Sequence, residues 1–133
     1  MKLLAIDIGT SCVKAARITN GVVGPVVREP VPNQLAGNRA EISPADLLSS
    51  VEHAAGTAVA GSPVDLIAFD TFSSGLIVLS STGEPRTPII THADRRSAAE
   101  AQELETAVPN ILTLTKQNII RAIPHRWKIT GRK

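Results

Sequence analysis

A carboxylate, a glycine turn and a lysine stand close together near the start of the chain. In the segment IDIGTSCVK, Asp7 ends an apolar run, Gly9 opens a turn and Lys14 lies on the returning run. Glycine lets a backbone approach an anion closely, and the amides and hydroxyls of Thr10 and Ser11 can donate to phosphate oxygens. Asp7 can hold Mg²⁺ through water, and Lys14 adds positive charge. The segment therefore predicts a phosphate-binding hairpin.

A purely structural interpretation of the same residues is open, in which Asp7 hydrogen-bonds the turn and Gly9 only permits it. The run of Leu, Ala and Ile around Asp7 favours the functional interpretation, because a buried carboxylate costs several kcal/mol unless it is paired or bound to a cation. The sequence contains neither a Gly-x-x-x-x-Gly-Lys-Ser/Thr loop nor a Gly-x-Gly-x-x-Gly fingerprint. The predicted hairpin would thus hold phosphate by an arrangement different from both of these motifs.

Strand-like runs must position these residues. Residues 2–8 and 12–19 flank the turn, and an Asn-Gly pair then precedes a Val-rich run at 22–27. We expect an antiparallel three-stranded meander whose first strand is central and covered on both faces. Residues 29–39 are rich in Pro, Gly and Asn and are predicted to be a surface connection.

Helical signals follow this connection. Ser43 suits an N-cap, Pro44 the first helical position, and Asp46 completes a capping box before apolar residues at helical spacing. Residues 64–70 read as a strand, and the strand, helix, strand order predicts a parallel crossover.

Shorter elements are expected later in the chain. Residues 76–79 and 88–91 read as extended pieces, and Ser97 with Glu100 predicts a second capping box that opens a short helix. Residues 111–123 have the pattern of an amphipathic helix.

Composition limits the class of protein. The chain has 133 residues, 43% of them hydrophobic, which predicts one domain and excludes a large two-domain catalytic machine. Its aromatic residues are Phe69, Phe72 and Trp127, too few for base-stacking platforms. The single cysteine excludes an internal disulfide and a multi-cysteine zinc site, and is compatible with the reducing cytoplasm. No stretch has the length and character of a signal peptide or a membrane span.

The net charge of +2 hides an asymmetry. Residues 1–105 hold 8 Lys and Arg against 12 Asp and Glu, whereas residues 106–133 hold 6 against none. Any basic surface that grips nucleic acid is therefore expected in the last segment.

The first motif resembles the first phosphate motif of the actin-like ATPase superfamily, which is Asp-x-Gly-Thr with a basic residue four positions after the Thr. The stretch IAFDTFSSGLIVLSSTGEPRTPIITHADRRSAAEAQELE is similar to the N-terminal domain of FGGY carbohydrate kinases, where a sugar-contacting loop, a hairpin and a Trp-x-Asp-x-Arg segment follow in this order. The resemblance covers about residues 2–107. It implies an incomplete ribonuclease-H-like α/β fold, with the meander joined by a parallel strand and helices. We expect residues 1–108 to form a partial kinase domain and residues 109–133 a basic tail.

The resemblance also implies roles for individual residues. Those expected to hold the ATP phosphates and Mg²⁺ are Asp7, Gly9, Thr10, Ser11, Cys12 and Lys14, with Asp7 facing the metal. Those expected to contact the sugar are Ser73, Ser74, Asp94 and Arg96. The family carries Met-His or Arg-Glu at the serine pair, so glycerol and xylulose are not favoured. It often carries Trp where this chain has His92, and a structural ion pair or a helix N-terminal charge explains Asp94 and Arg96 equally well.

Function follows from the resemblance as an expectation. In FGGY kinases the aspartate that accepts the sugar proton and the adenosine-binding domain lie beyond the segment that this chain resembles, so no catalytic residue is predicted here. We expect a cytoplasmic N-terminal part of an ATP-dependent sugar kinase, shortened by truncation or a reading-frame change and inactive alone. The alternative is a non-catalytic module that binds nucleotide through the hairpin or nucleic acid through the tail. No membrane partner is expected, and an uncovered sheet edge predicts self-association.

Overall fold

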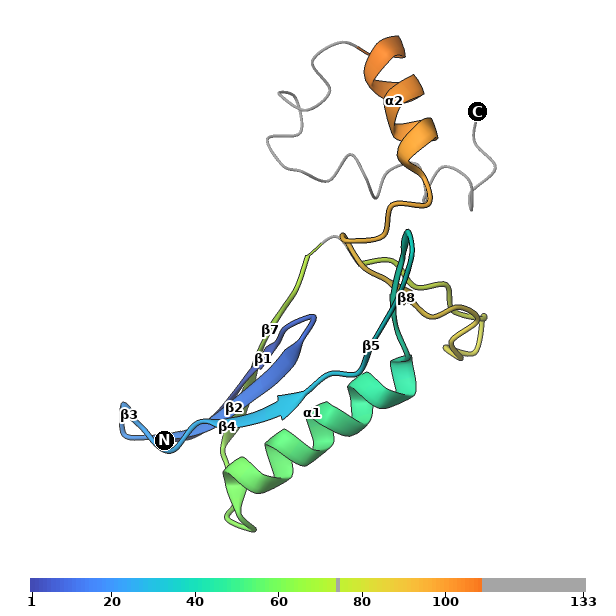
Figure 1. Cartoon of the computed structure of the whole chain (residues 1–133). Helices are drawn as coiled ribbons and strands as arrows, with labels where there is room; N and C mark the ends of the chain where they lie inside the picture. Colours follow the sequence, from blue (N-terminus) through green and yellow to red (C-terminus); the bar gives the residue numbers. More distant parts are fainter. Residues whose placement is uncertain (74, 109–133) are drawn as a thin grey trace. The chain divides into compact units, whose positions relative to one another are not determined.

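A computed structural model describes residues 1–73 and 75–108, which form two compact units. The first unit consists of Met1–Asn33 and Ile42–Phe72, and the second of Gln34–Glu41 and the described residues from Ser73 onward. In chain order the elements are β1 (Lys2–Ile8), β2 (Cys12–Thr19), β3 (Val22–Val23), β4 (Val27–Pro30), β5 (Asn33–Ala36), β6 (Arg39–Ile42), α1 (Pro44–Val59), β7 (Leu66–Thr71), β8 (Ile89–Ile90) and α2 (Ala98–Ala107) (Figure 1).

The first unit is built on a mixed sheet with β1 at its centre. β1 pairs antiparallel with β2 and parallel with β7, and both β3 and β4 pair with β2. The predicted meander and the parallel crossover through α1 are confirmed. The third strand of the meander is divided into β3 and β4 around Pro25, because proline has no amide hydrogen to donate to the ladder.

One face of this sheet is covered by α1 (Figure 1). Leu4, Ile6, Val13 and Ala15 are buried between them. The expectation that β1 is covered on both faces is wrong for the described residues. Side chains alternate along a strand, and the face that carries Asp7 has no described helix of the first unit packed on it.

Side chains fix the ends and the register of α1. The Ser43 hydroxyl accepts a hydrogen bond from the Asp46 amide, as the capping box predicts. At the other end Ala60 adopts a left-handed conformation, and its amide donates to Gly56 O. Midway along the helix, Ser50 Oγ donates to Pro30 O, which ties α1 to β4.

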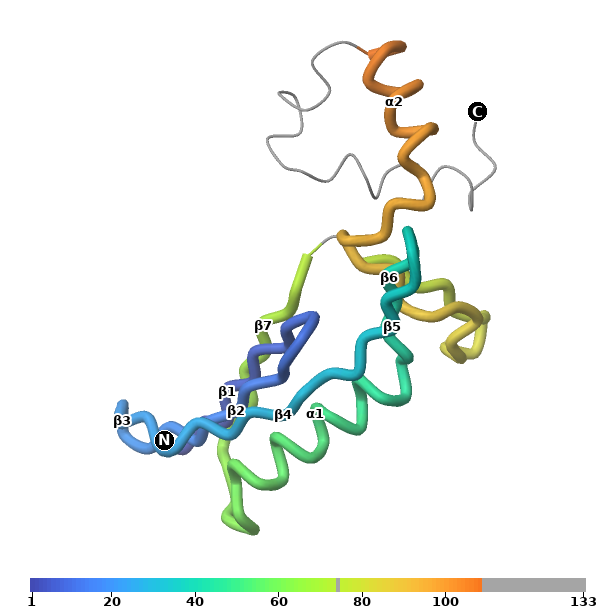
Figure 2. Tube along the Cα trace, in the orientation of Figure 1, coloured from blue at the N-terminus to red at the C-terminus, as the bar shows by residue number. Residues whose placement is uncertain are grey.

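The second unit contains a small sheet in the order β5-β6-β8. Figure 2 follows the Cα trace through β5 and β6, which are joined by a turn in which Gly37 has a positive φ. The prediction of a surface connection over 29–39 is therefore wrong. Its prolines lie at the end of β4 and just before β5, positions that edge strands tolerate, and its Gly-Asn pair makes the hairpin turn.

Of the elements predicted after residue 75, some are confirmed and others are not. Residues 76–79 do not form a strand; they contribute only isolated bridges, Leu76 with Ile90 and Leu79 with Pro85. The short helix is confirmed as α2, but Ser97 makes no side-chain capping hydrogen bond, so the second capping box is not formed. The expected helix at 111–123 lies outside the described residues. No helix within the described part of the chain is long and apolar enough to cross a membrane.

We expect Ser43→Ala to lower the free energy of unfolding by about 1 kcal/mol, because the Asp46 amide loses its acceptor. Ser49→Ala is the matched control, since Ser49 is exposed inside α1 and alanine favours helix there. Urea denaturation of both variants measures the difference. Equal stability of the two variants would contradict the importance of this cap.

Candidate functional site

The turn between β1 and β2 closes only with glycine at position 9. The Gly9 amide donates to Cys12 O at 3.1 Å, and a Cβ atom on Gly9 would lie 2.8 Å from that oxygen. Two neighbours hold the turn in place: the Val31 amide donates to Ser11 O, and the side-chain amide of Asn33 donates to Thr10 O. The turn is therefore tight, and hydrogen bonds from Val31 and Asn33 hold its backbone in place.

Four hydrogen-bond donors in this turn are unused. Neither the amides nor the hydroxyls of Thr10 and Ser11 donate to any described residue. Ser11 is exposed and Thr10 is half-buried, so both are accessible to a ligand. Successive free amides in a tight turn form a concavity that suits an anion. Cys12 contributes no free donor from its thiol, which donates to Val13 O.

An ion pair lies beside the turn. Lys14 Nζ is 2.8 Å from Asp7 Oδ2, because the antiparallel register places these two residues opposite each other. The hydrogen bond to the Asp7 carboxylate, together with its charge, raises the pKa of Lys14. The sequence argument that Asp7 is buried and short of partners is wrong. Its side chain is 49% exposed, on the face that α1 does not cover, and Lys14 is its partner.

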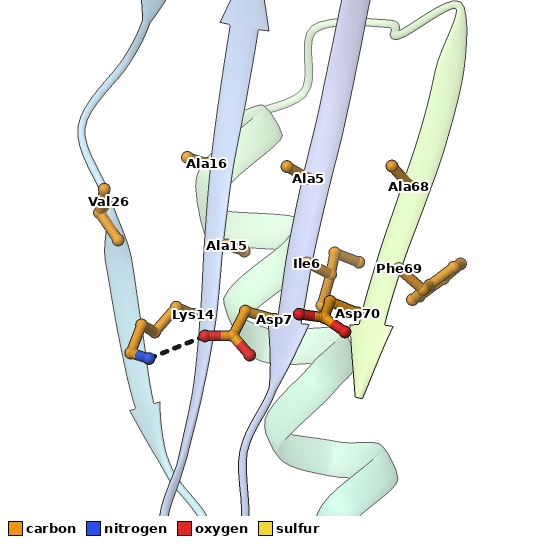
Figure 3. A pocket seen from close by; sticks show the side chains of 10 residues that line it. All are labelled: Ala5, Ile6, Asp7, Lys14, Ala15, Ala16, Val26, Ala68, Phe69 and Asp70. Atoms are coloured by element: carbon orange, nitrogen blue, oxygen red, sulfur yellow. Dashed lines mark hydrogen bonds and ion pairs between the residues drawn. The ribbon is translucent and has the colours of Figure 1, made fainter. Parts of the chain in front are cut away.

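A second carboxylate shares this side of the sheet. Asp70 is in parallel register with Asp7, and Figure 3 shows Lys14 and Asp70 on either side of it. The three residues line an open depression of about 290 Å³ whose other walls include Ala5 and Ala68. Asp70 Oδ1 also accepts a hydrogen bond from the Thr71 amide. The sequence signal for Asp70 was its place at the end of a strand predicted to run parallel to β1.

Asp94 and Arg96 form a charged cluster in the second unit. Asp94 is 2% exposed and accepts hydrogen bonds from the Ala40 amide at 2.9 Å and from Arg96 Nη2 at 2.7 Å. Arg96 also donates to Glu41, which is buried on β6. Sequence reasoning missed Glu41, because nothing in the local pattern pairs it with a residue 55 positions away.

Burial and hydrogen bonding act in opposite directions on Asp94. Burial alone raises the pKa of a carboxyl, but hydrogen bonds from Arg96 and the Ala40 amide outweigh it and lower the pKa of Asp94 from 3.8 to about 2. The bond to Asp94 also raises the pKa of Arg96. Asp94 and Arg96 are therefore both charged at neutral pH.

The remaining predicted sugar residues are only partly placed. Ser73 is exposed in the second unit, and Ser74 lies outside the described residues. Asp94 is committed to Ala40 and Arg96, while the Arg96 side chain keeps 34% of its surface exposed. Sugar contact by these four residues stays a prediction. Among the described residues, no group of three or more His, Cys, Asp or Glu side chains is arranged to hold a metal ion.

Comparison with solved structures identifies the fold. A xylulose kinase from Brucella ovis matches 99% of this chain with a TM-score of 0.84 at 21% identity, over 30% of its own length. A gluconate kinase from Lactobacillus acidophilus matches 80% of the chain with a TM-score of 0.73 at 23% identity, over 22% of its length. A Plasmodium falciparum glycerol kinase, solved with ADP, matches 82% with a TM-score of 0.72 at 17% identity, over 24% of its length.

The chain has the fold of part of the carbohydrate kinases that it matches. It spans between a fifth and a third of the length of the solved kinases that it matches. No protein-family model matches the sequence, and no curated protein matches it either. The likeness therefore rests on the arrangement of the strands and helices and not on sequence identity.

We expect Gly9→Ala to destabilise this kinase-like fold by about 1–3 kcal/mol, because its Cβ would meet the Cys12 carbonyl oxygen. Gly56→Ala is the control: a Cβ there meets nothing within 4 Å, and alanine stabilises a helix interior by about 0.5–1 kcal/mol. Thermal or urea unfolding gives both values. Equal stability of the Gly9→Ala variant and the parent chain would show that the turn can relax.

We expect Asp94 to make the free energy of unfolding depend on pH in the acidic range. Because its pKa is lowered from 3.8 to about 2, its contribution of about 2 kcal/mol is complete above pH 3.8 and is lost as the pH falls through 2. Asp94→Asn removes this titration. The difference in free energy of unfolding between the parent chain and the variant should stay constant above pH 4 and shrink toward pH 2. A difference that does not change with pH would contradict the assignment.

Proposed function

We propose that the β1–β2 hairpin binds the terminal phosphates of Mg-ATP as one side of a carbohydrate kinase site, for phosphoryl transfer to a sugar hydroxyl. The observation that carries this proposal is the set of unused donors on Thr10 and Ser11, placed next to Lys14 and Asp7. The kinase-like fold supports it, as does the glycerol kinase of the same fold that was solved with ADP.

Each residue has a distinct part in this proposal. Gly9 lets the phosphate approach the backbone, and the amides and hydroxyls of Thr10 and Ser11 donate to its oxygens. Asp7 holds Mg²⁺, with Asp70 on the same side of the sheet as a second oxygen donor. Mg²⁺ commonly takes one or two carboxylates together with phosphate and water oxygens, so these residues fit it.

Lys14 can serve two partners in the proposed site, Asp7 and a phosphate. Without ligand it neutralises Asp7, so neither charge is exposed unpaired on the sheet. With the Asp7 carboxylate engaged by Mg²⁺, the Lys14 ammonium group would be free to donate to a phosphate oxygen.

On the sugar side we propose that Ser73, Ser74 and Arg96 contact the sugar and that Asp94 takes part by holding Arg96. Asp94 and Glu41 fix the guanidinium of Arg96, whose exposed part can donate to a hydroxyl. Asp94 itself positions Arg96, because its carboxylate is buried.

We propose further that the chain does not transfer phosphate by itself. Transfer requires the sugar hydroxyl and the γ-phosphate to be aligned between two walls of a cleft, with charge stabilised from both sides. The chain matches only 22–30% of the length of the solved kinases.

Calorimetric titration with ATP, with and without Mg²⁺, tests the binding. The chain should bind Mg-ATP more tightly than ATP alone. Lys14→Met should weaken binding at least about tenfold through loss of a charge-assisted hydrogen bond. Asp7→Asn should abolish the effect of Mg²⁺. Glu52→Gln, on an exposed position of α1, is the control and should bind as the parent chain does.

Three results would contradict parts of the proposal. A folded parent chain that binds no ATP would overturn nucleotide binding, and so would Lys14→Met and Asp7→Asn variants that bind as the control does. Transfer of phosphate from Mg-ATP to any sugar by the purified chain would overturn its inactivity. Binding to nucleic acid that disappears when residues 110–133 are deleted would instead support the tail as the functional part.

A further inference from the structure

Arg28 extends the charged side of the sheet in the first unit by one strand. It lies on β4 directly opposite Lys14 on β2, and paired residues of an antiparallel ladder project to the same face. Lys14 is in turn opposite Asp7 on β1, and Asp7 is in register with Asp70 on β7. Figure 3 shows Asp70, Asp7 and Lys14 following one another across these strands. Arg28 is thus the fourth charged residue of one row that crosses the sheet.

The contacts of Glu29, the next residue of β4, confirm the face to which Arg28 projects. Glu29 is opposite Val13, which is buried under α1. Its Oε2 atom lies 3.0 Å from Nδ1 of His53 on α1, so the Glu29 carboxylate is on the face that the helix covers. Because side chains alternate along a strand, Arg28 projects to the other face, where it is exposed. The adjacent carboxylate of β4 is therefore directed away from Arg28.

The row has two halves of opposite charge. Its members on β7 and β1 are carboxylates, and its members on β2 and β4 are basic. The hydrogen bond and the charge of Asp7 raise the pKa of Lys14, and the positive charge of Arg28 acts against them, so the two basic groups are close enough to repel each other. A magnesium–phosphate complex has the same polarity, with a cation on one side and oxyanions on the other. The row therefore suits such a complex in one orientation.

We propose that Arg28 is a second basic contact for the phosphate chain, beside Lys14 and the β1–β2 turn. This inference rests on the proposed function and adds a residue to it. The metal ion then lies toward the carboxylates of β1 and β7, and the phosphate oxygens lie toward β2 and β4.

Charge balance and geometry both favour this role for Arg28. Without it, the row would hold the two carboxylates of Asp7 and Asp70 against one basic group, and its net negative charge would repel a phosphate. A bound phosphate also removes the repulsion between Arg28 and Lys14, because both can then donate to one anion. The planar guanidinium group offers several N–H donors that match the spacing of phosphate oxygens.

Calorimetric titration of the full chain with Mg-ATP and with magnesium tripolyphosphate, which has the phosphates without the nucleoside, tests the inference. Arg28→Gln should weaken the binding of both ligands about fivefold or more, because one charge-assisted hydrogen bond is lost. Arg28→Lys keeps the charge and loses the planar donor group, so it should weaken binding less. Lys2→Gln is the control matched in charge: Lys2 is exposed at the far end of β1, and this variant should bind as the parent does.

The outcomes separate this inference from the proposed function. An unchanged urea midpoint for Arg28→Gln would show that weaker binding is not a loss of folding. If the parent chain binds Mg-ATP and Arg28→Gln binds it equally well, this inference is wrong and the proposed function stands. A parent chain that binds neither ligand would overturn both. Binding of tripolyphosphate without binding of ATP would overturn nucleotide binding alone, and weaker binding of tripolyphosphate by Arg28→Gln would then still support the phosphate contact.

Discussion

The double pairing of β1 is the constraint on which the candidate site depends. Its antiparallel ladder with β2 places Lys14 opposite Asp7, and its parallel ladder with β7 places Asp70 on the other side. A shift of one residue in either ladder would move the partner to the opposite face of the sheet, because side chains alternate. The packing of Leu4 and Val13 under α1 holds these ladders in register. The apolar core is thus what brings three charged groups together on the other face.

The second unit depends on a different interaction, the charged cluster around Asp94. Its carboxylate joins the Ala40 amide on β6 to the guanidinium of Arg96, and Glu41 completes the set. A buried carboxylate is costly unless its lone pairs are used, and here they accept several donors. The first unit leaves both partners of its ion pair half-exposed, whereas the second buries the carboxylate of its ion pair and holds it with several hydrogen bonds.

Local signals in the sequence were sufficient for several elements. The Asn-Gly pair after β2 and the capping residue Ser43 each predicted a structure that the fold confirms, because turns and caps depend on residues close in sequence. Gly37 and Asn38 show the limit of such signals. Glycine and asparagine suit both irregular loops and hairpin turns, and the nearby prolines led to the prediction of a loop where the structure has a hairpin. The prediction of a strand at 76–79 was wrong because this segment pairs only through isolated bridges. A strand needs a partner along its whole length, and the local sequence does not show where that partner lies.

The sequence by itself determined the motif around Gly9, the antiparallel meander that begins with β1 and β2, and the capping of α1, all of which depend on contacts between residues close in sequence. Only the tertiary structure decided which charges meet. That Asp7 is exposed and paired with Lys14, that Asp70 stands beside it, and that Arg96 reaches Glu41 all follow from strand register and from contacts between distant residues. The physical reason is that the free energy of a charge depends on its surroundings in space, and a sequence lists only its neighbours along the chain.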